Sequence, residues 1–340
     1  MSDSRAGETP QTKSQRWRLW LLLGGVLLVI AFSLLLGRYP EAGLTSPHAL
    51  LENPLAQRLV LNLRLPRVLA AFTMGMALSA AGVVLQMVFR NPLVDAGFLG
   101  VSQGAAFGAS LAIVFLGGAP LWIQGSAAFF AFLGLTTSYF IAQRIRLGDW
   151  ALRLVLAGIA VSALYSAGVS LLKYIADPLR ALSEITFWLL GGLWGITWSD
   201  VMQILPVVIP SMLILYLMRW RLNLLSMRDE TALSLGVTPG RERAVLLVAA
   251  VASTAAVISK TGLIGWIGLI VPHIARRLLG SDAQHSMPGA MLLGGMFALL
   301  CDDIARTALA GEIPLGILTS SIGAAIFIVL LTRREVKIRT

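Results

Sequence analysis

One short string in the chain could carry covalent chemistry. Residues 100–104, GVSQG, match the GxSxG pattern, in which a serine nucleophile lies on a sharp turn between a strand and a helix. Here the string stands at the entrance of a long apolar segment, and no histidine lies at a matching depth to activate Ser102. An intramembrane hydrolase is a rival interpretation that lacks its second residue, so we expect no catalytic residue in this chain.

Metal and nucleotide chemistry also lack their usual residues. None of the three histidines, His48, His273 and His285, belongs to an HExxH motif or has a partner four residues away. The one cysteine, Cys301, excludes a disulfide framework and a CxxC site. No GxxxxGKS/T loop is present, because Lys260 lacks the preceding glycine. We expect no cofactor and no metal site, and if ATP drives this protein, another chain must bind it.

Acidic residues in apolar surroundings are few. Asp302, Asp303 and Arg306 cluster near the end of one apolar segment, and Glu312 follows. Two interpretations stay open: the acids pair with the arginine to orient a helix end, or the cluster forms a docking or gating surface. No run of carboxylates along one helix suggests a proton relay. This counts against the alternative function, an ion-gradient-driven secondary transporter.

The composition shows that the residues discussed above must be positioned by membrane-spanning helices. The chain has 340 residues, of which 57% are apolar and 13% are charged, and 33 are glycine. A soluble domain is about 45–50% apolar even with glycine included, so a water-soluble globule is excluded. A helix needs about 20 apolar residues to cross a bilayer. Ten such segments recur, at approximately 19–36, 66–88, 98–117, 120–142, 152–172, 201–219, 244–259, 262–279, 287–306 and 313–332.

The rest of the chain connects these segments or extends beyond them. We expect a disordered cytoplasmic tail at 1–18, a ten-helix domain at 19–332 and a basic cytoplasmic tail at 333–340. Within the domain, residues 174–200 are too short and glycine-broken to span and predict an interfacial helix. Residues 219–243 form a long polar loop with a helical piece of its own. The sequence thus predicts an all-α membrane protein with about ten transmembrane helices.

The basic residues give the orientation. The net charge is +10, and 19 of the 27 cations fall on one side of the ten segments when the N-terminal tail is placed inside. Lysine and arginine collect in cytoplasmic loops, so both termini are predicted to be cytoplasmic. The charge is therefore mainly a topology signal, and a nucleic acid is not expected as a partner.

Small residues recur at helix-packing spacings. Gly104 and Gly108 are four residues apart, as are Gly75 and Ser79, and a glycine stripe follows the segment at 244–259. Such residues let helix backbones approach closely. Tight packing and a reshaping wall of a transport pathway both remain open, and the candidates for either role are Gly100, Ser102, Gly104, Gly262, Gly265 and Gly268.

Eight strings in order resemble the permease family of type II ABC importers, which move ferric siderophores, haem or cobalamin through the bacterial inner membrane. They cover essentially the whole chain after the tail. Three departures occur: VDAG follows NPL where the family has Ala-Asp-Pro, Cys301 replaces a small residue, and so do Lys260 and Thr261. The strings are RLPR (64–67), NPL (91–93), LGVSQGA (99–105), FWLLGGLWG (187–195), SLGV (234–237), IGWIGLIVPHIAR (264–276), DDIAR (302–306) and EIPLGILTSSIGAAIF (312–327).

The resemblance implies a homodimer with the pathway on its two-fold axis, two cytoplasmic ATPase subunits and an external substrate-binding protein. It also implies that Arg64, Arg67 and Arg306 receive carboxylates of the binding protein. We therefore expect a multi-pass subunit of the inner membrane that imports a metal chelate; a ferric siderophore is favoured, and haem and cobalamin stay open. The ATPase contact is expected on the segment DETALSLGV, at Asp229, Glu230, Thr231, Leu233, Leu235 and Gly236.

Overall fold

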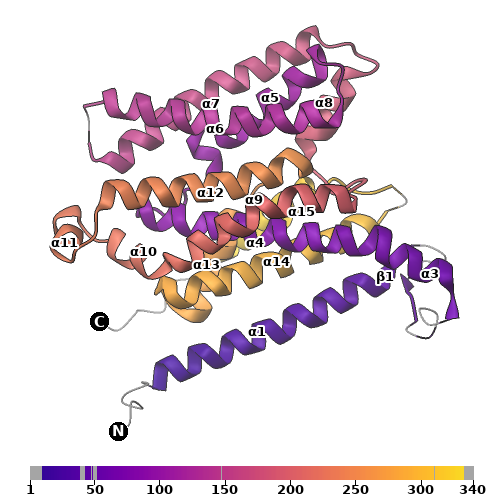
Figure 1. Cartoon of the computed structure of the whole chain (residues 1–340), viewed down its shortest axis with the longest axis horizontal. Coiled ribbons are helices and arrows are strands. Elements are labelled where there is room, and N and C mark those ends of the chain that lie inside the picture. Colours follow the sequence, from indigo (N-terminus) through magenta and orange to yellow (C-terminus); the bar gives the residue numbers. More distant parts are fainter. Residues whose placement is uncertain are drawn as a thin grey trace.

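The computed structural model describes residues 10–38, 43–46, 48, 52–146, 148–309 and 311–332. Long helices run side by side in an elongated bundle (Figure 1). We call the end that carries α10 (Arg219–Leu225) and α11 (Asp229–Ser234) the α11 end, and the end that carries α3 (Pro54–Leu59) and the hairpin of β1 (Leu36–Gly37) and β2 (Gly43–Leu44) the α3 end. The predicted all-α class is confirmed, since the hairpin of two-residue strands is the one sheet in the described residues.

The elements follow the chain in a simple order. Two short non-α turns, η1 and η2, flank α4, and α8, α10 and α11 are short helices in connecting segments. The bounds are α1 Pro10–Leu35, β1 Leu36–Gly37, β2 Gly43–Leu44, α3 Pro54–Leu59, η1 Val60–Arg64, α4 Leu65–Val88, η2 Ala96–Leu99, α5 Val101–Phe115, α6 Pro120–Arg144, α7 Trp150–Ile175, α8 Ala181–Leu190, α9 Trp198–Leu217, α10 Arg219–Leu225, α11 Asp229–Ser234, α12 Pro239–Thr261, α13 Ile267–Leu279, α14 Ala283–Thr307 and α15 Leu315–Thr332.

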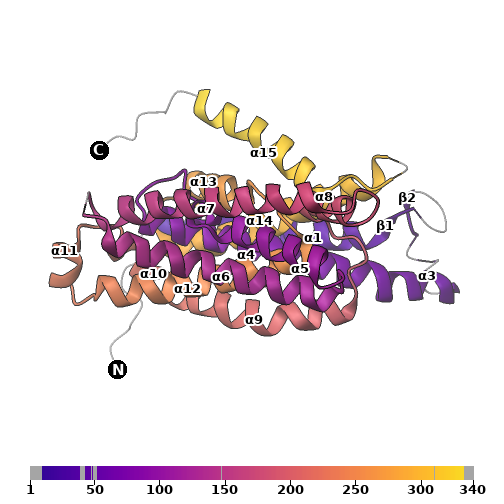
Figure 2. The same cartoon turned by 90° about the horizontal axis from the view of Figure 1, so that it is seen from above.

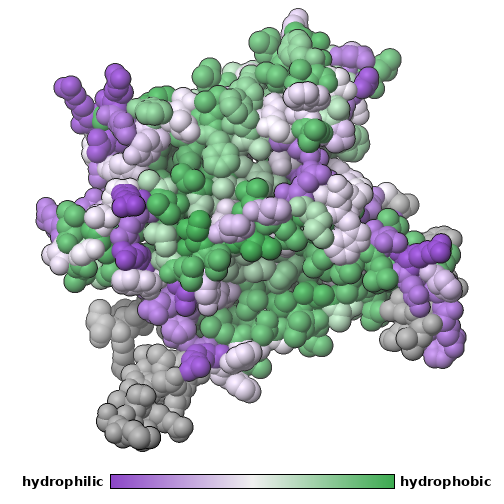
Figure 3. Space-filling model, viewed as in Figure 1, coloured by the Kyte–Doolittle hydropathy of each residue, from purple (hydrophilic) through white to green (hydrophobic). Residues whose placement is uncertain are grey.

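The outer surface fits a membrane. Eight helices of the described chain are long and apolar enough to cross a bilayer. Figure 3 shows an apolar band across the middle of the bundle, with hydrophilic residues gathered toward its two ends. Because lipid cannot hydrogen-bond a backbone, helices are the form in which such a chain can span.

Helix α4 forms the centre of the bundle and packs against α12, α13 and α14. Two glycine crossings allow this. A Cβ on Gly75 would lie 2.1 Å from the carbonyl oxygen of Gly294 on α14, and one on Gly82 would lie 2.0 Å from that of Gly268 on α13. The helix backbones therefore pack closely at these two crossings, and any residue larger than glycine there would push the helices apart.

Two of the ten predicted spans are shorter than expected. The segment predicted at 98–117 is α5, and Gly100 precedes it with a φ of 79°. The segment predicted at 262–279 is α13, preceded by a non-helical stretch that begins at Gly262 with a φ of 68°. At 1.5 Å per residue, these helices of 15 and 13 residues reach only about 20 Å, less than a bilayer core of about 30 Å.

Other boundaries also differ from the prediction. Helix α1 begins at Pro10, so residues 10–18 are helical rather than part of a disordered tail. Residues 1–9 and the basic tail at 333–340 lie outside the described residues. The short helix expected within 174–200 is α8, and the loop at 219–243 contains two helices, α10 and α11, instead of one.

One side of the bundle lacks a packing partner. Figure 2 shows α7, α8, α13 and α15 along this side, with α15 splayed away from the rest. Only 17% of the most apolar 18-residue stretch of α15 is buried, and the corresponding stretches of the outer helices α1, α7 and α9 are 11%, 28% and 28% buried. These helices therefore leave a long apolar surface free within the single chain.

Candidate functional site

The first candidate site lies at the α3 end, where Arg67 of α4 is held between two carboxylates. Its Nε and Nη2 donate to Asp302 of α14 at 2.9–3.1 Å, and its Nη1 and Nη2 donate to Glu312 at 2.8 and 2.9 Å. The Asp302 side chain is 2% exposed and that of Glu312 is 34% exposed. Arg67 therefore joins an inner acid to an outer one.

The other two predicted docking arginines are also close by. Arg64 donates from Nη1 to the carbonyls of Leu34 and Leu35 and to Thr45. Arg306 pairs with Asp303 and donates to the carbonyl of Ser33. Both arginines are buried, and with Arg67 they line one cavity of about 250 Å³.

The structure thus brings the three predicted arginines together but gives each of them internal acceptors. An arginine that donates to internal carboxylates and carbonyls is not presented to a partner as a free charge. The first of the two open interpretations, Asp–Arg pairing at a helix end, accounts for Asp303 and Arg306. A docking role stays a prediction, and the exposed Glu312 is the member of the cluster that a partner could reach.

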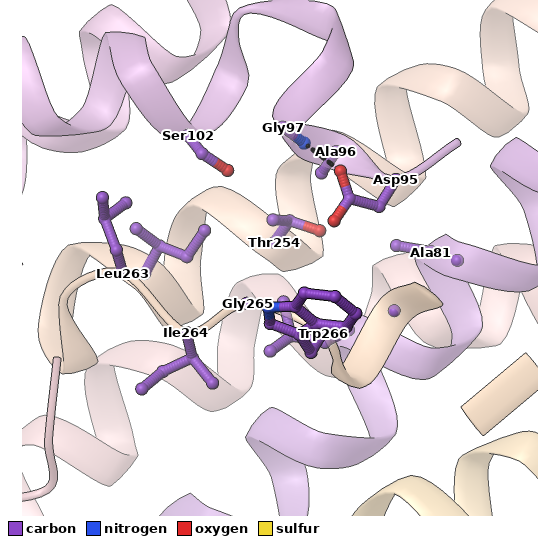
Figure 4. A pocket seen from close by; sticks show the side chains of 14 residues that line it. Ala81, Asp95, Ala96, Gly97, Ser102, Thr254, Leu263, Ile264, Gly265 and Trp266 are labelled. Carbon is purple, nitrogen blue, oxygen red and sulfur yellow. Dashed lines mark hydrogen bonds between the residues drawn. The ribbon is translucent and has the colours of Figure 1, made fainter. Parts of the chain in front are cut away.

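The second candidate site is a cavity of about 210 Å³ inside the bundle, which we call the Asp95 cavity (Figure 4). It is lined by residues of α4, η2, α5, α12 and the start of α13. Asp95 caps η2 by accepting from the amide of Gly97 at 2.8 Å. Gly97 in turn accepts from Ser162, halfway along α7, so the segment before α5 enters the bundle to mid-depth.

The polar groups of the Asp95 cavity are sparse. Figure 4 shows Asp95, Ser102 and Thr254 around it, with the hydroxyl of Thr254 directed toward the carboxylate. That hydroxyl is buried and has no hydrogen-bond partner among the described atoms. Asp95 is an intramembrane acid that sequence reasoning missed, because it follows NPL in an apparent loop. The Pro–Leu–Val–Asp–Ala–Gly order, with Asp in a helix-capping position, was the available signal.

The glycine and serine candidates divide between packing and cavity. A Cβ on Gly104 would lie 2.3 Å from the carbonyl of Phe130, so Gly104 packs against α6. Gly100 and Gly262 have positive φ and interrupt helices. Ser102, Gly265 and Gly268 line the Asp95 cavity. The glycines at 262, 265 and 268 do not form a helical stripe, because α13 begins only at Ile267.

The same geometry removes the context that a GxSxG nucleophile requires. Ser102 stands in the first turn of α5 after a 3₁₀ turn, not between a strand and a helix. No cluster of three or more His, Cys, Asp or Glu residues that could hold a metal ion occurs in the described part of the chain.

The third candidate site lies at the α11 end. Helix α11 turns one buried side chain, Ala232, toward the bundle, while Leu233 and Leu235 are 57% and 54% exposed. Gly236 follows with a φ of 78°, and its amide bonds to the carbonyl of Leu233, which ends the helix as predicted. Two large apolar side chains are therefore exposed to solvent, one in the last turn of this short helix and one at its C-cap.

Asp229 fastens this helix to the bundle. It accepts from both Nη atoms of Arg243 on α12, at 2.6 and 3.1 Å, and from Arg90 after α4 at 3.3 Å. The hydrogen bonds from Arg243 lower the pKa of Asp229 below its ordinary value, and the charges of Arg243 and Arg90 add to the effect. Arg243 is itself buried and lies over the ring of Trp150 on α7.

Helix α10 adds two further links. Arg221 pairs with Glu242 in the first turn of α12. Asn223 donates to Asp282 at 2.7 Å and accepts from the amide of Ala283, so it holds the start of α14. The sequence singled out Asp229 but missed Arg90 and Arg243, which fix it, since nothing in the spacing links residues so far apart.

The fold and these sites define a class of protein. A multi-pass helical bundle with two interrupted helices, an unpartnered apolar side and a fastened apolar helix at one end has the organisation of a transporter permease that works with further subunits. Comparison with known proteins identifies the class more closely.

The model of the FecCD transport family matches residues 24–333, and the chain belongs to that family. It is 38% identical over 313 residues to a Helicobacter pylori protein named "Probable iron chelatin transport system permease protein", covering 91% of this chain and 94% of the relative. It is 38% identical over 321 residues to the molybdate import system permease MolB of Haemophilus influenzae, with the same coverage of both chains.

A solved structure gives the same result. A structure described as "An inward-facing conformation of a putative metal-chelate type ABC transporter" matches with a TM-score of 0.86 and 37% identity, over 93% of this chain and 99% of the other. The chain is therefore a permease subunit of an ABC importer, and the resemblance found in the sequence is confirmed. Such a subunit works with an ATPase and a substrate-binding protein, and it is a multi-pass membrane protein.

Proposed function

We propose that this chain forms one half of a homodimeric permease in the bacterial inner membrane, with both termini and the α11 end in the cytoplasm. The excess of cations at the α11 end supports this orientation. The splayed helix α15 supports the dimer, because a second copy would cover its apolar surface around a two-fold pathway.

Energy coupling is proposed to act through α11. The observation that carries this is a pair of exposed leucines, Leu233 in the last turn of α11 and Leu235 just after it, on an element that Asp229 fastens to α12. Exposed apolar side chains on a rigid helix fit a groove of a partner. Two ATPase subunits, one for each permease, would bind there. The chain itself has no GxxxxGKS/T loop, so we propose that it hydrolyses no ATP.

Docking of the external binding protein is proposed at the α3 end. Arg67 holds one inner acid, Asp302, and one outer acid, Glu312. A carboxylate of the binding protein could replace Glu312 on Arg67 without disturbing Asp302. Such an exchange of charge-assisted hydrogen bonds would set the register of the contact.

The cargo is proposed to be a metal chelate, with a ferric siderophore as the first candidate. Relatives of equal identity are named for iron chelatin and for molybdate, so family membership alone does not select between a chelate and an oxyanion. The test is a binding assay on the cognate binding protein with a ferric siderophore, haemin, cobalamin and molybdate. Tight binding of molybdate alone would overturn the chelate proposal.

The orientation and the coupling can be tested together. Cys301 is 1% exposed, so a cysteine introduced for Arg228 beside α11 can be labelled selectively. A membrane-impermeant maleimide should label it in inverted vesicles and not in intact cells, and the ATPase subunit should protect it. Labelling from outside would contradict the whole topology, and labelling without protection would contradict the ATPase contact.

A further inference from the structure

The segment between α4 and α5 touches two of the sites described above. At its start stands Arg90, which has a φ of 50° although it is not glycine. Its Nη2 donates to the carbonyl of Met227 and to Asp229. Arg90 therefore holds both the backbone just before α11 and the first residue of α11.

A positive φ is costly for a residue with a side chain, such as arginine, and it persists where surrounding contacts impose it. Here the contacts lie on both sides of the residue. Phe89 stacks on Trp150 of α7 with ring centroids 5.6 Å apart, and the amide of Asn91 bonds to the carbonyl of Gln86. The backbone around Arg90 is thus fixed to the end of α4 while its side chain reaches α11.

The chain beyond Arg90 leads directly into the bundle. Within a few residues it reaches Asp95, which caps η2 and lines the Asp95 cavity. The carbonyl of Gly97 accepts from Ser162 of α7, and Phe98 is 40% exposed. No α-helix intervenes between Arg90 and the cavity. A displacement of Arg90 would therefore act on the wall of the cavity and on the start of α5.

The second partner of Asp229 has a different position. Arg243 is buried and belongs to α12, a helix that spans the bundle without interruption. Its side chain is 7% exposed, whereas that of Arg90 is 39% exposed. Arg243 therefore serves to hold α11 in place. The side chain of Arg90 is less buried, so it can move together with α11 while losing fewer packing contacts than Arg243 would.

We infer that Arg90 is a positioning residue for transport, which passes a movement of α11 to the Asp95 cavity through the segment 91–99. The inference rests on the proposed role of α11 as the ATPase contact. It names the route by which ATP binding to the ATPase subunits affects the start of α5, at mid-depth in the bundle. Coupling of this kind requires that the segment has two arrangements, which the ATPase populates differently.

The test uses the complete importer, with permease, ATPase and binding protein reconstituted in lipid vesicles. Phe98→Cys serves as the reporter, and its rate of modification by a small water-soluble maleimide is compared with and without ATP and vanadate. Arg90→Gly removes the guanidinium but keeps a residue that accepts positive φ. Arg241→Ala is the matched control, because Arg241 is exposed in the first turn of α12 and has no hydrogen bond or ion pair among the described residues.

With Arg90 present and in the Arg241→Ala control, ATP should change the modification rate of Phe98→Cys by about fivefold or more, the usual lower range of coupling between sites. In Arg90→Gly the rate should no longer respond to ATP, while the ATPase still co-purifies with the permease. A full response in Arg90→Gly would overturn the inference. Loss of ATPase association in that variant would also overturn it, since Arg90 would then only anchor α11.

Failure of the proposed function gives a different result. If Leu233→Asp leaves ATPase association unchanged, α11 is not the ATPase contact, whatever Arg90 does. If Leu233→Asp abolishes association and Arg90→Gly keeps both association and the response of Phe98→Cys, the ATPase contact stands and the route through Arg90 is wrong.

Discussion

The α3 end and the α11 end both use arginine, but in opposite ways. At the α3 end, Arg67 and Arg306 are almost enclosed and are paired with Asp302, Asp303 and Glu312. At the α11 end, Asp229 is half exposed and receives arginines from two other elements. Enclosed pairs hold helices together, whereas the half-exposed Asp229 leaves α11 available to a partner although its own partner Arg243 is buried. The same residue types therefore predict different consequences of mutation at the two ends.

The largest effect is expected at the α3 end. Arg67→Ala leaves the buried Asp302 carboxylate with only Arg306, whose Nε lies 3.9 Å away, and breaking such a buried pair costs about 3–5 kcal/mol. The purified permease should show a clearly lower thermal midpoint and reduced yield. Arg58→Ala, at an exposed position of α3, is the control and should be neutral. An Arg67→Ala permease with unchanged stability that only fails to bind the binding protein would show that the cluster is a docking surface and not a structural one.

At the α11 end, a comparable charge change should leave the fold intact. Leu233 is 57% exposed, so Leu233→Asp should change the free energy of unfolding by less than about 0.5 kcal/mol. Association with the ATPase should weaken by about tenfold or more, as for a central apolar anchor of an interface. Gln284→Asp, exposed in the first turn of α14, provides the control for added charge at this end. If both variants weaken ATPase association equally, the effect comes from the added negative charge and not from the loss of the Leu233 side chain.

A smaller effect is expected where α11 ends. Gly236 has a φ of 78° and open space around its Cα, so a side chain there meets backbone strain and no clash. Gly236→Val should cost about 1–2 kcal/mol locally and lower the stimulation of ATP hydrolysis by the binding protein. Gly236→Asn should be close to wild type, because asparagine tolerates this conformation. If both variants behave alike in reconstituted vesicles, the helix stop has no role in coupling.

The lengths of the apolar segments were enough to predict the helical class and a helix at each of the ten places, eight of which are long enough to span in the described chain, because a bilayer requires such segments. The interruptions before α5 and α13 were not predicted, since an apolar stretch does not reveal where a glycine adopts positive φ. Asp95 was likewise missed: its helix-capping order was visible in the sequence, but its depth in the bundle follows from tertiary contacts such as that of Gly97 with Ser162. Pairs such as Asp229 with Arg90 depend on tertiary contact between distant segments.

The smallest expected effect concerns pH at the α11 end. Hydrogen bonds from Arg243 lower the pKa of Asp229, so this contact stabilises the attachment of α11 above the ordinary carboxyl range, near pH 4, and is lost as the pH falls through the lowered pKa. Between pH 8 and 5 the labelling rate of Arg228→Cys, corrected for thiolate ionisation, should stay constant, and it should rise only below about pH 4. Asp229→Asn should show a raised rate throughout and no such step. A midpoint near pH 6 in the wild-type background would mean that another group controls α11, and the half-exposed Asp229 would then not be its fastening.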